Sequence, residues 1–458
     1  MSSNQSMPER PTAAAAETLV PSKFGKAIKG EFLFDPTWKN FNHGSFGTYP
    51  RAIRDRLRGY QDMAESRPDP FIRYDYPRLL DESRAAVAAV IKAPLEGVVF
   101  VSNATVGVNT VFRNLAWDPD GKDVVLTFST AYEACAKVVD HVADTTGGRV
   151  EHRQIDIPYP IEDDEILRRL RDTVQQIVAE GKHARACIYD IVSSRPAVLF
   201  PWERATALCR ELGVLSIVDG AQGVGMVPID VGAADPDFFV SNCHKWLLAP
   251  RGCAVFYAPE RNHHLLPTTL AVSHGYAPKL TQRTSPLPPS GKSAFVSKFE
   301  FCGTMDNAPY LCVKDAVAWR KEVLGGEEAI IEYLWDLNKK GSKIVAEALG
   351  THVLENEAGT LTNNAMANVA LPIWHGAKGP DAADGDVALT TEESPGAFQW
   401  MLRTMKDDYR TFMSLFIHGG RYWVRISAQV YLELEDYVWV SGVLKELCQR
   451  VARKEFRA

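Results

Sequence analysis

The sequence has no long hydrophobic run, no excess of basic charge and no paired cysteine motif. No stretch approaches the ~20 apolar residues that a membrane-spanning helix requires, so we expect no membrane association. The 57 Asp and Glu residues outnumber the 51 Lys and Arg residues, giving a net charge of -6. Nucleic-acid-binding proteins usually carry a basic stripe instead, so we expect no nucleic acid partner. The eight cysteines lack CxxC spacing, which argues against a disulfide framework or zinc site and favours the reducing cytoplasm.

The first 20 residues also lack the apolar core of a secretory signal. Large apolar side chains are scarce there, and we interpret residues 1–29 as a flexible tail. The whole chain is 46% hydrophobic and 24% charged, which is typical of a globular protein. Its 458 residues suffice for two or three domains.

Short apolar runs alternate with amphipathic stretches between residues 98 and 258. The predicted strands are 98–101, 123–128, 186–192, 214–219, 238–241 and 253–258, and 202–213 is an intervening helix. Nearly continuous apolar strands separated by helices predict an α/β fold whose mainly parallel sheet is covered on both faces. Ligands of such sheets bind at the carboxyl ends of the strands, so functional residues are expected directly after each run.

Changes in composition predict the domain organisation. The Pro- and Ser-rich segment 278–293 cannot continue a helix or strand, and the polar segment 376–396 is typical of an exposed insertion. We expect residues 30–70 to line the active site and residues 71–310 to form a large ligand-binding domain. A smaller α+β domain is predicted over 311–458.

Four strand ends carry residues that packing alone explains poorly. Ser102 to Thr105 opens a helix, whose N-terminus can bind an anion, although a simple N-cap is an alternative. Tyr132 can stack on a flat ligand or be a core tyrosine. Asp219 ends a buried strand and requires a cation or hydrogen bonds, unless it only forms an Asp-Gly turn. Lys245 lies in an apolar setting where a free ammonium would be costly.

These four features together fit a ligand with a phosphate, a protonatable ring nitrogen and an aldehyde, which is pyridoxal 5'-phosphate. A lysine in a Schiff base has no free ammonium, so the burial of Lys245 would no longer be costly. Asp219 would keep the ring nitrogen protonated and make the cofactor an electron sink.

Six segments in order resemble the class V aminotransferase group of fold-type I pyridoxal-phosphate enzymes. They are "NHGSFG" (42–47), "SNAT" (102–105), "VDGAQG" (218–223), "SNCHKW" (241–246), "FEFCGTMDN" (299–307) and "YWVRISAQVY" (422–431). The resemblance spans about residues 30–453. It implies a large, mainly parallel-sheet domain and a smaller α+β C-terminal domain.

The resemblance also implies a role for each matching residue. Lys245 would carry the cofactor and move the Cα proton. Asp219 would pair with the ring nitrogen, Gln222 would hydrogen-bond the ring hydroxyl, and Tyr132 would cover the ring face and act in catalysis.

The phosphate and the substrate have their own implied ligands. The phosphate would be held by Ala104, Thr105, Ser241 and His244, and by Gly303 and Thr304 of a neighbouring subunit, which implies a homodimer with shared sites. Arg425 would bind the carboxylate of an amino-acid substrate, a task suited to a guanidinium. Asn42 and His43 would line the substrate side.

Within this group, "NHGSFG" and "SNCHKWL" are similar to the isopenicillin N epimerase-like branch. "KSAFVSKFEF" and "SHGYAP" are similar to the fungal hercynylcysteine sulfoxide lyases of ergothioneine biosynthesis, and the loline-pathway cyclase belongs near the same branch. We therefore predict β-elimination at a C–S bond. Epimerisation and cyclisation stay open, because all three reactions begin with loss of the Cα proton. The arginine-rich run expected before Arg425 is reduced to Arg421.

Other functions are less well supported by the residues. A non-catalytic scaffold would not be expected to retain Lys245, Asp219 and Arg425 together. Adjacent His263 and His264 point apart and lack a partner carboxylate, so no metal site is predicted. A cysteine desulfurase needs a mobile cysteine, and no cysteine lies in an evident flexible loop; Cys243 is interpreted as a packed thiol.

Overall fold

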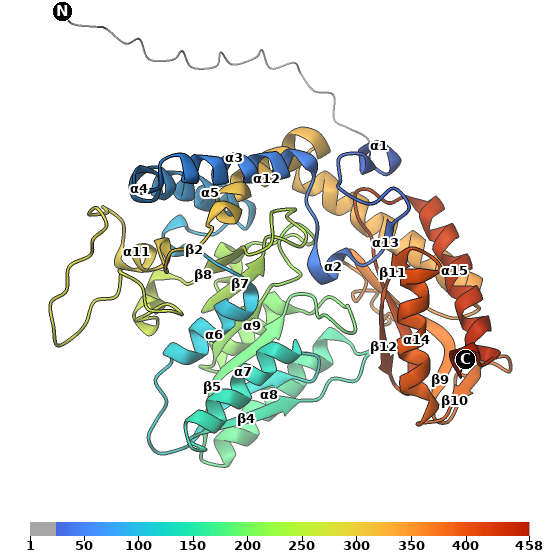
Figure 1. Cartoon of the computed structure of the whole chain (residues 1–458). Coiled ribbons are helices and arrows are strands. Elements are labelled where there is room, and N and C mark those ends of the chain that lie inside the picture. The colour runs from blue at the N-terminus through green and yellow to red at the C-terminus, as the bar shows by residue number, and fades with distance from the viewer. Residues whose placement is uncertain (1–23, 458) are drawn as a thin grey trace, which may run out of the picture.

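The computed structural model describes residues 24–457. The predicted tail therefore lies outside the described residues, apart from its end, which forms helix α1 (Lys26–Lys29). Figure 1 shows a large unit built around an extended sheet and a smaller unit on the right that contains the C-terminus.

Seven strands form the sheet of the large unit. In spatial order they are β2 (Val98–Val101), β8 (Ala254–Tyr257), β7 (Phe238–Asn242), β6 (Leu215–Asp219), β5 (His183–Asp190), β3 (Asp123–Phe128) and β4 (Val150–Ile155). Only β8 runs against its neighbours, so the predicted mainly parallel sheet is confirmed. Strand β4 was not predicted, because its sequence VEHRQI is largely polar at the sheet edge.

Both faces of this sheet are buried, which explains its continuous apolar strands. Val99 and Val101 pack toward α6 (Ala104–Asn114) and α7 (Glu133–Thr145). Their neighbours in sequence, Val98 and Phe100, pack into the core on the opposite face. The helices of that face are α5 (Tyr76–Val90), α8 (Asp163–Ala179) and α9 (Trp202–Glu211). Successive strand residues point to opposite faces, so both positions must be apolar.

The remaining helices of the large unit frame this core. They are α3 (Arg51–Ser66), α4 (Pro68–Pro70) with the π-helix Phe71–Asp75, α10 (Val231–Ala234), α11 (Ala294–Glu300), α12 (Ala308–Leu324) and the short 3₁₀ helices Leu95–Gly97 and Glu260–Leu265. The Pro-rich segment 278–293 contains neither helix nor strand, as predicted. No helix within residues 24–457 is long and apolar enough to cross a membrane.

The small unit contains a four-stranded sheet and three helices. Its strands, in spatial order, are β10 (Val387–Leu389), β9 (Met366–His375), β13 (Arg421–Ser427) and β12 (Ser414–His418). Its helices are α13 (Glu327–Leu349), α14 (Glu393–Asp407) and α15 (Leu434–Ala452), followed by the 3₁₀ helix Glu455–Arg457.

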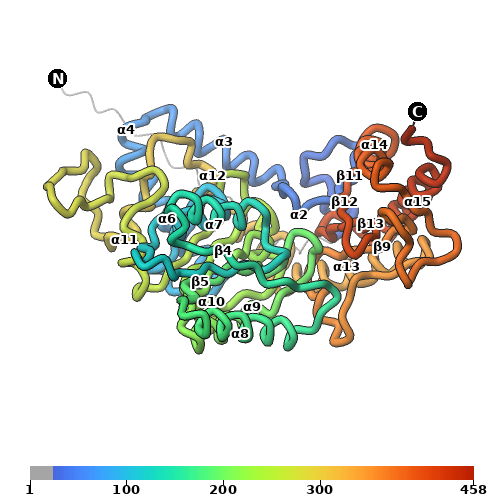
Figure 2. Tube along the Cα trace, turned by 90° about the horizontal axis from the view of Figure 1, so that it is seen from below, coloured from blue at the N-terminus to red at the C-terminus, as the bar shows by residue number. Residues whose placement is uncertain are grey.

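The N-terminal segment joins the small unit before it reaches the large one. Strand β1 (Lys39–Asn40) pairs in parallel with β11 (Thr411–Phe412). Helix α2 (His43–Phe46) follows directly, and Figures 1 and 2 place it between the two units. Residues just after β1 are therefore positioned to contact side chains from both units.

Most residues of segment 376–396 are exposed, but the segment also contains regular structure. It contains β10, which pairs with β9, and the first turn of α14. Asp386 within the segment is buried and lies 3.5 Å from a guanidinium nitrogen of Arg421, whose other terminal nitrogen is 2.9 Å from Asp381. These carboxylates neutralise a buried arginine, a role that the polar composition of the segment did not reveal.

Candidate active site

A cavity of about 190 Å³ lies at the carboxyl ends of the central strands and contains most of the predicted site residues. Its walls are formed by Ser45, Phe46, Asn103, Ala104, Thr105, Tyr132, Cys135, Asp190, Ser194, Asp219, Ala221, Gln222, Asn242, His244 and Lys245. A larger cavity of about 750 Å³ between the end of α5, residues 224–229 and the start of α13 is mostly apolar and contains none of them. The smaller cavity, which we call the lysine pocket, is therefore the candidate site.

Lys245 follows β7 and points into the lysine pocket. Burial lowers the pKa of its amine to about 8, and the positive charge of Arg425 acts in the same direction. A lysine with this pKa is partly neutral near pH 8 and can act as a nucleophile.

The backbone of Lys245 is held from the N-terminal segment. His43 donates from Nε2 to the Lys245 carbonyl at 2.7 Å, and its Nδ1 lies 3.1 Å from the Tyr431 hydroxyl. Burial lowers the pKa of His43 to about 4, so its ring is neutral. The sequence predicted that His43 lines the substrate side. The structure places it behind the lysine pocket instead, because both ring nitrogens are engaged by the protein.

Two aspartates end adjacent strands beneath the lysine. The Asp219 carboxylate accepts the Ala221 N–H at 2.9 Å and the Cys135 thiol at 3.2 Å, and burial raises its pKa. Asp190, its register partner on β5, also lines the pocket, and burial together with the charge of Asp219 raises its pKa well above the usual range. Asp190 was not predicted, because the expected strand 186–192 placed it inside an apolar run, whereas β5 ends at Asp190.

The N-terminus of α6 forms the anion-binding end of the pocket. Asn103 caps the helix by accepting the Val106 N–H at 2.9 Å, and Thr105 contributes a hydroxyl and an N–H at the pocket wall. The Ala104 N–H already donates to Asn242 Oδ1 at 2.9 Å. His244 closes this end and donates from Nδ1 to the Cys253 carbonyl at 3.2 Å.

Ser241 differs from the role predicted for it. Its hydroxyl accepts the Val224 N–H at 3.0 Å and donates to the Gly220 carbonyl in a short hydrogen bond, and the side chain is fully buried. Asn242 faces the pocket in its place, because successive side chains of β7 point to opposite faces of the sheet.

Tyr132 and Gln222 lie where the sequence placed them, on the pocket wall. Tyr132 precedes α7 and is 45% exposed, and no described residue bonds its hydroxyl. The Gln222 amide donates to the Gly44 carbonyl at 2.7 Å and accepts the Trp246 indole N–H at 2.8 Å. Gln222 therefore also holds α2 against Trp246, the residue that follows Lys245.

Arg425 on β13 reaches the pocket edge from the small unit. Its guanidinium donates to Asn42 Oδ1 at 2.8 Å, to Ser45 Oγ at 2.7 Å and to the Ser194 carbonyl at 2.8 Å. All of these acceptors are neutral, and Nε is buried without a partner among the described residues. Burial therefore lowers the pKa of Arg425 to about 10, and the group lacks the counter-ion that a carboxylate ligand would supply.

Gly303 and Thr304 do not line the lysine pocket of their own chain. They lie on the exposed loop between α11 and α12.

The pocket fits pyridoxal 5'-phosphate. Asp219 has two hydrogen-bond donors but no cationic partner, which a protonated ring nitrogen would supply. The free N–H and hydroxyl of Thr105 at a helix N-terminus suit a phosphate, and the partly neutral amine of Lys245 suits an aldehyde.

Comparisons with known proteins agree with this chemistry. Residues 74–290 match the family described as "Aminotransferase class-V". The L-cysteine desulfhydrase-like protein lolT1 of Epichloe uncinata is 34% identical over 94% of this chain and 97% of its own length. The chain belongs to the class V aminotransferase family. Its cofactor is pyridoxal 5'-phosphate, and it is a pyridoxal-phosphate-dependent lyase.

Two further known proteins are similar to this chain over nearly its whole length. The hercynylcysteine sulfoxide lyase of Schizosaccharomyces pombe is 31% identical over 93% of this chain and 98% of its own length. The solved structure of the cystine C-S lyase C-DES has a TM-score of 0.69 at 16% identity and covers 90% of this chain and 98% of its own. The second likeness confirms the predicted fold-type I architecture.

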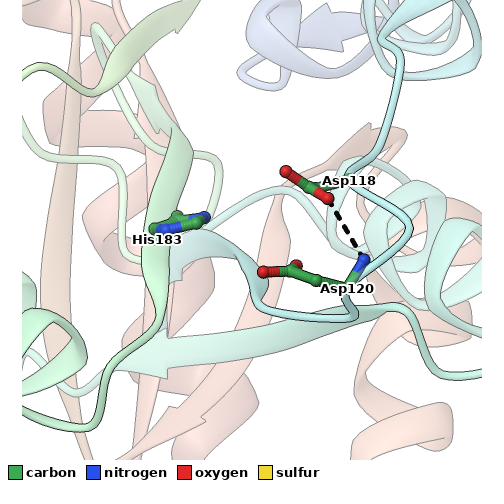
Figure 3. A group of neighbouring side chains, drawn as sticks. All are labelled: Asp118, Asp120 and His183. Atoms are coloured by element: carbon green, nitrogen blue, oxygen red, sulfur yellow. Dashed lines mark hydrogen bonds between the residues drawn. The ribbon is translucent and has the colours of Figure 1, made fainter.

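A group of potential metal ligands lies far from this site. Asp118, Asp120 and His183 are exposed, and their ligand atoms lie within 4.8 Å of one another (Figure 3). Asp118 accepts the Asp120 N–H at 3.1 Å, and Asp120 accepts the Lys122 N–H at 3.0 Å, so both carboxylates stabilise the turn before β3.

His263, one of the two adjacent histidines considered in the sequence, stacks on Phe295 with ring centroids 3.9 Å apart. These contacts are structural.

Proposed function

We propose that the chain is a C–S lyase that catalyses β-elimination from a cysteine sulfoxide conjugate such as hercynylcysteine sulfoxide. The Cα–H and Cβ–S bonds break, a Cα=Cβ bond forms, and the sulfur group leaves with a proton. Water then converts the remaining enamine to pyruvate and ammonia. The observation that carries this proposal is the lysine pocket itself: a basic amine and a free phenol line it, and the uncompensated guanidinium of Arg425 lies directly behind two of its wall residues, Ser45 and Ser194.

Three side chains supply the steps. The Arg425 guanidinium binds the α-carboxylate and orients the Cα–H bond, since its other contacts are neutral. Lys245 Nζ accepts the Cα proton, for which a pKa near 8 is suited. The Tyr132 hydroxyl, free at the pocket wall, protonates the leaving group. The bound cofactor would accept the electrons left on Cα.

The positions of the cysteines support elimination over desulfuration. A desulfurase requires a mobile thiol that reaches the substrate sulfur. Cys135 is the one cysteine lining the lysine pocket within residues 24–457, and its thiol is buried and donates to Asp219. Cys243 is packed in the core, in line with the sequence interpretation. Neither thiol is placed to accept sulfur.

The test is to incubate the cofactor-loaded protein with hercynylcysteine sulfoxide and to assay pyruvate and ammonia. We expect equal release of both products, and in Lys245→Ala the loss of release and of the visible band that depends on the bond between Lys245 and the cofactor. A colourless protein that does not take up the cofactor would contradict the whole proposal. Entry of solvent deuterium at Cα without pyruvate release would contradict elimination and favour the epimerase or cyclase alternative.

The proposal includes a homodimer with shared sites, located in the cytoplasm. The loop with Gly303 and Thr304 is exposed and avoids its own pocket, which supports contact with a second copy. Phe46, 71% exposed at the pocket wall, and Met305, 48% exposed, are apolar surfaces that a second copy would cover. Free, mostly buried cysteines support a reducing compartment. Sedimentation analysis showing a monomer at micromolar concentration would contradict the dimer.

A further inference from the structure

Arg195 lies in the wall of the cavity next to the lysine pocket and has no hydrogen-bond or ion-pair partner within residues 24–457. It follows Ser194, the residue whose carbonyl accepts a hydrogen bond from Arg425. Its side chain is exposed. Lys137, the other cation on the same wall, pairs with Glu133 at 2.5 Å. Arg195 is therefore the cation available to a ligand there.

The space beside Arg195 continues from the lysine pocket. A cavity of about 330 Å³ shares Tyr132 and Ser194 with that pocket and includes Arg195 in its wall. A third cavity of about 310 Å³ shares Arg195 with the second one and ends at residues 416–418 of β12. The three cavities form a succession that leads from Lys245, past Arg195, to the small unit. We call the outer two the side-chain channel.

Arg195 lines the side-chain channel, and Arg425 lies behind Ser194, a wall residue shared by the lysine pocket and this channel. Burial lowers the pKa of Arg425 to about 10, and the nearby positive charge of Arg195 acts in the same direction. Arg425 is buried among neutral acceptors, and Arg195 is exposed without any.

Arg421 is the other arginine that could bind a second anionic group of the substrate, but its guanidinium already pairs with carboxylates of the protein. Arg421 lies on the same strand as Arg425, but its guanidinium pairs with Asp381 and Asp386 and lies over the Trp374 ring. It is buried and lines none of the three cavities. A second anionic group of the substrate would therefore meet Arg195, on the large unit, and not a residue of β13.

We propose that Arg195 binds a second carboxylate at the far end of the substrate side chain. This inference rests on the proposed function for the orientation of the amino acid, with the α-carboxylate at Arg425. The substrate class is then an α-amino acid whose sulfur substituent is long enough to reach the side-chain channel and ends in an acid. Arg195 selects this class, and Lys245 and Tyr132 carry out the reaction whatever the substituent.

The test compares two ligands that differ only in charge, S-(3-carboxypropyl)-L-cysteine and its terminal amide. Binding is measured by calorimetry on the cofactor-loaded Lys245→Ala variant, which cannot turn them over, and pyruvate release is measured on the wild type. We expect the acid to bind about tenfold more tightly than the amide, as a charge-assisted hydrogen bond would produce. The ratio of the affinities for the acid and the amide should fall to about one in Arg195→Gln and stay partly above one in Arg195→Lys.

The matched control is Arg403→Gln, which removes an exposed arginine on α14 outside all three cavities and should leave the preference at the wild-type value. Equal binding of acid and amide with Arg195 present would overturn the inference. So would a preference that persists in Arg195→Gln. Calorimetry separates this inference from the proposed function, because the acid preference can exist without pyruvate release, and pyruvate release can occur without the preference.

Discussion

Asp190 and Asp219 are paired in register at the ends of adjacent parallel strands, and both carboxylates are buried. Asp219 accepts two hydrogen bonds, whereas no other described residue donates to the Asp190 side chain. Burial raises the pKa of both carboxyls, and the charge of Asp219 raises that of Asp190 further. The two buried carboxylates therefore destabilise the cofactor-free chain, and binding of the cofactor's protonated ring nitrogen would reduce this cost.

Replacement of Asp190 should stabilise the cofactor-free protein. A carboxyl whose pKa is raised in the folded state contributes stability below its unfolded pKa and loses it as pH rises through the folded value. Asn cannot ionise, so Asp190→Asn removes this loss. We expect the free energy of unfolding to rise by about 1–3 kcal/mol near pH 7, and by less toward pH 4, where the Asp190 carboxyl is protonated in the wild type as well. Thermal unfolding at both pH values measures it. The exposed control Asp144→Asn on α7 should change neither value, and a gain independent of pH would contradict the explanation.

Cofactor uptake should depend on the titration of Lys245. The pKa of its amine is about 8, and only the neutral amine attacks an aldehyde. The rate at which the cofactor-free protein regains its visible band should therefore rise with pH with a midpoint near 8. Since the charge of Arg425 contributes to the lowered pKa, the midpoint should move upward in Arg425→Gln. A midpoint unchanged in that variant would show that burial alone sets the pKa.

Loss of the Tyr132 hydroxyl should slow elimination without releasing the cofactor. Tyr132→Phe retains the ring at the pocket wall but cannot protonate the leaving group. We expect kcat for pyruvate release to fall about 10²- to 10⁴-fold, with the cofactor spectrum unchanged. Solvent deuterium should still enter Cα, because Lys245 is intact. An unchanged kcat would assign the proton to another donor.

Gly47 should tolerate no side chain. Its φ of 63° is in the left-handed region, and a Cβ there would lie 1.8 Å from the His244 carbonyl oxygen. Gly47→Ala should cost about 1–2 kcal/mol from the backbone alone and displace the loop that carries Lys245. Urea unfolding and cofactor affinity measure the two effects. Gly30→Ala is the control, since nothing lies within 4 Å of its Cβ position and its φ is -62°. Equal stability of both variants would contradict the predicted clash.

The sequence by itself determined six of the seven strands of the large sheet and singled out the lysine and the aspartate. Strands 98–101 and 123–128 match their predicted limits because strands buried on both faces must be apolar at every position. Lys245 and Asp219 were found because a charged residue directly after such a run has no packing explanation. Strand β4 was not predicted, because a strand at the edge of a sheet need not be apolar.

Only the tertiary structure decided which neighbouring side chains face the pocket. The alternation of β7 turns Asn242 inward and Ser241 away, and the position of α2 between the units places His43 behind Lys245. Likewise, segment 376–396 engages Arg421 and leaves Arg195 free. Each of these outcomes depends on residues far apart in the chain, and their contacts follow from packing between elements and not from any local pattern.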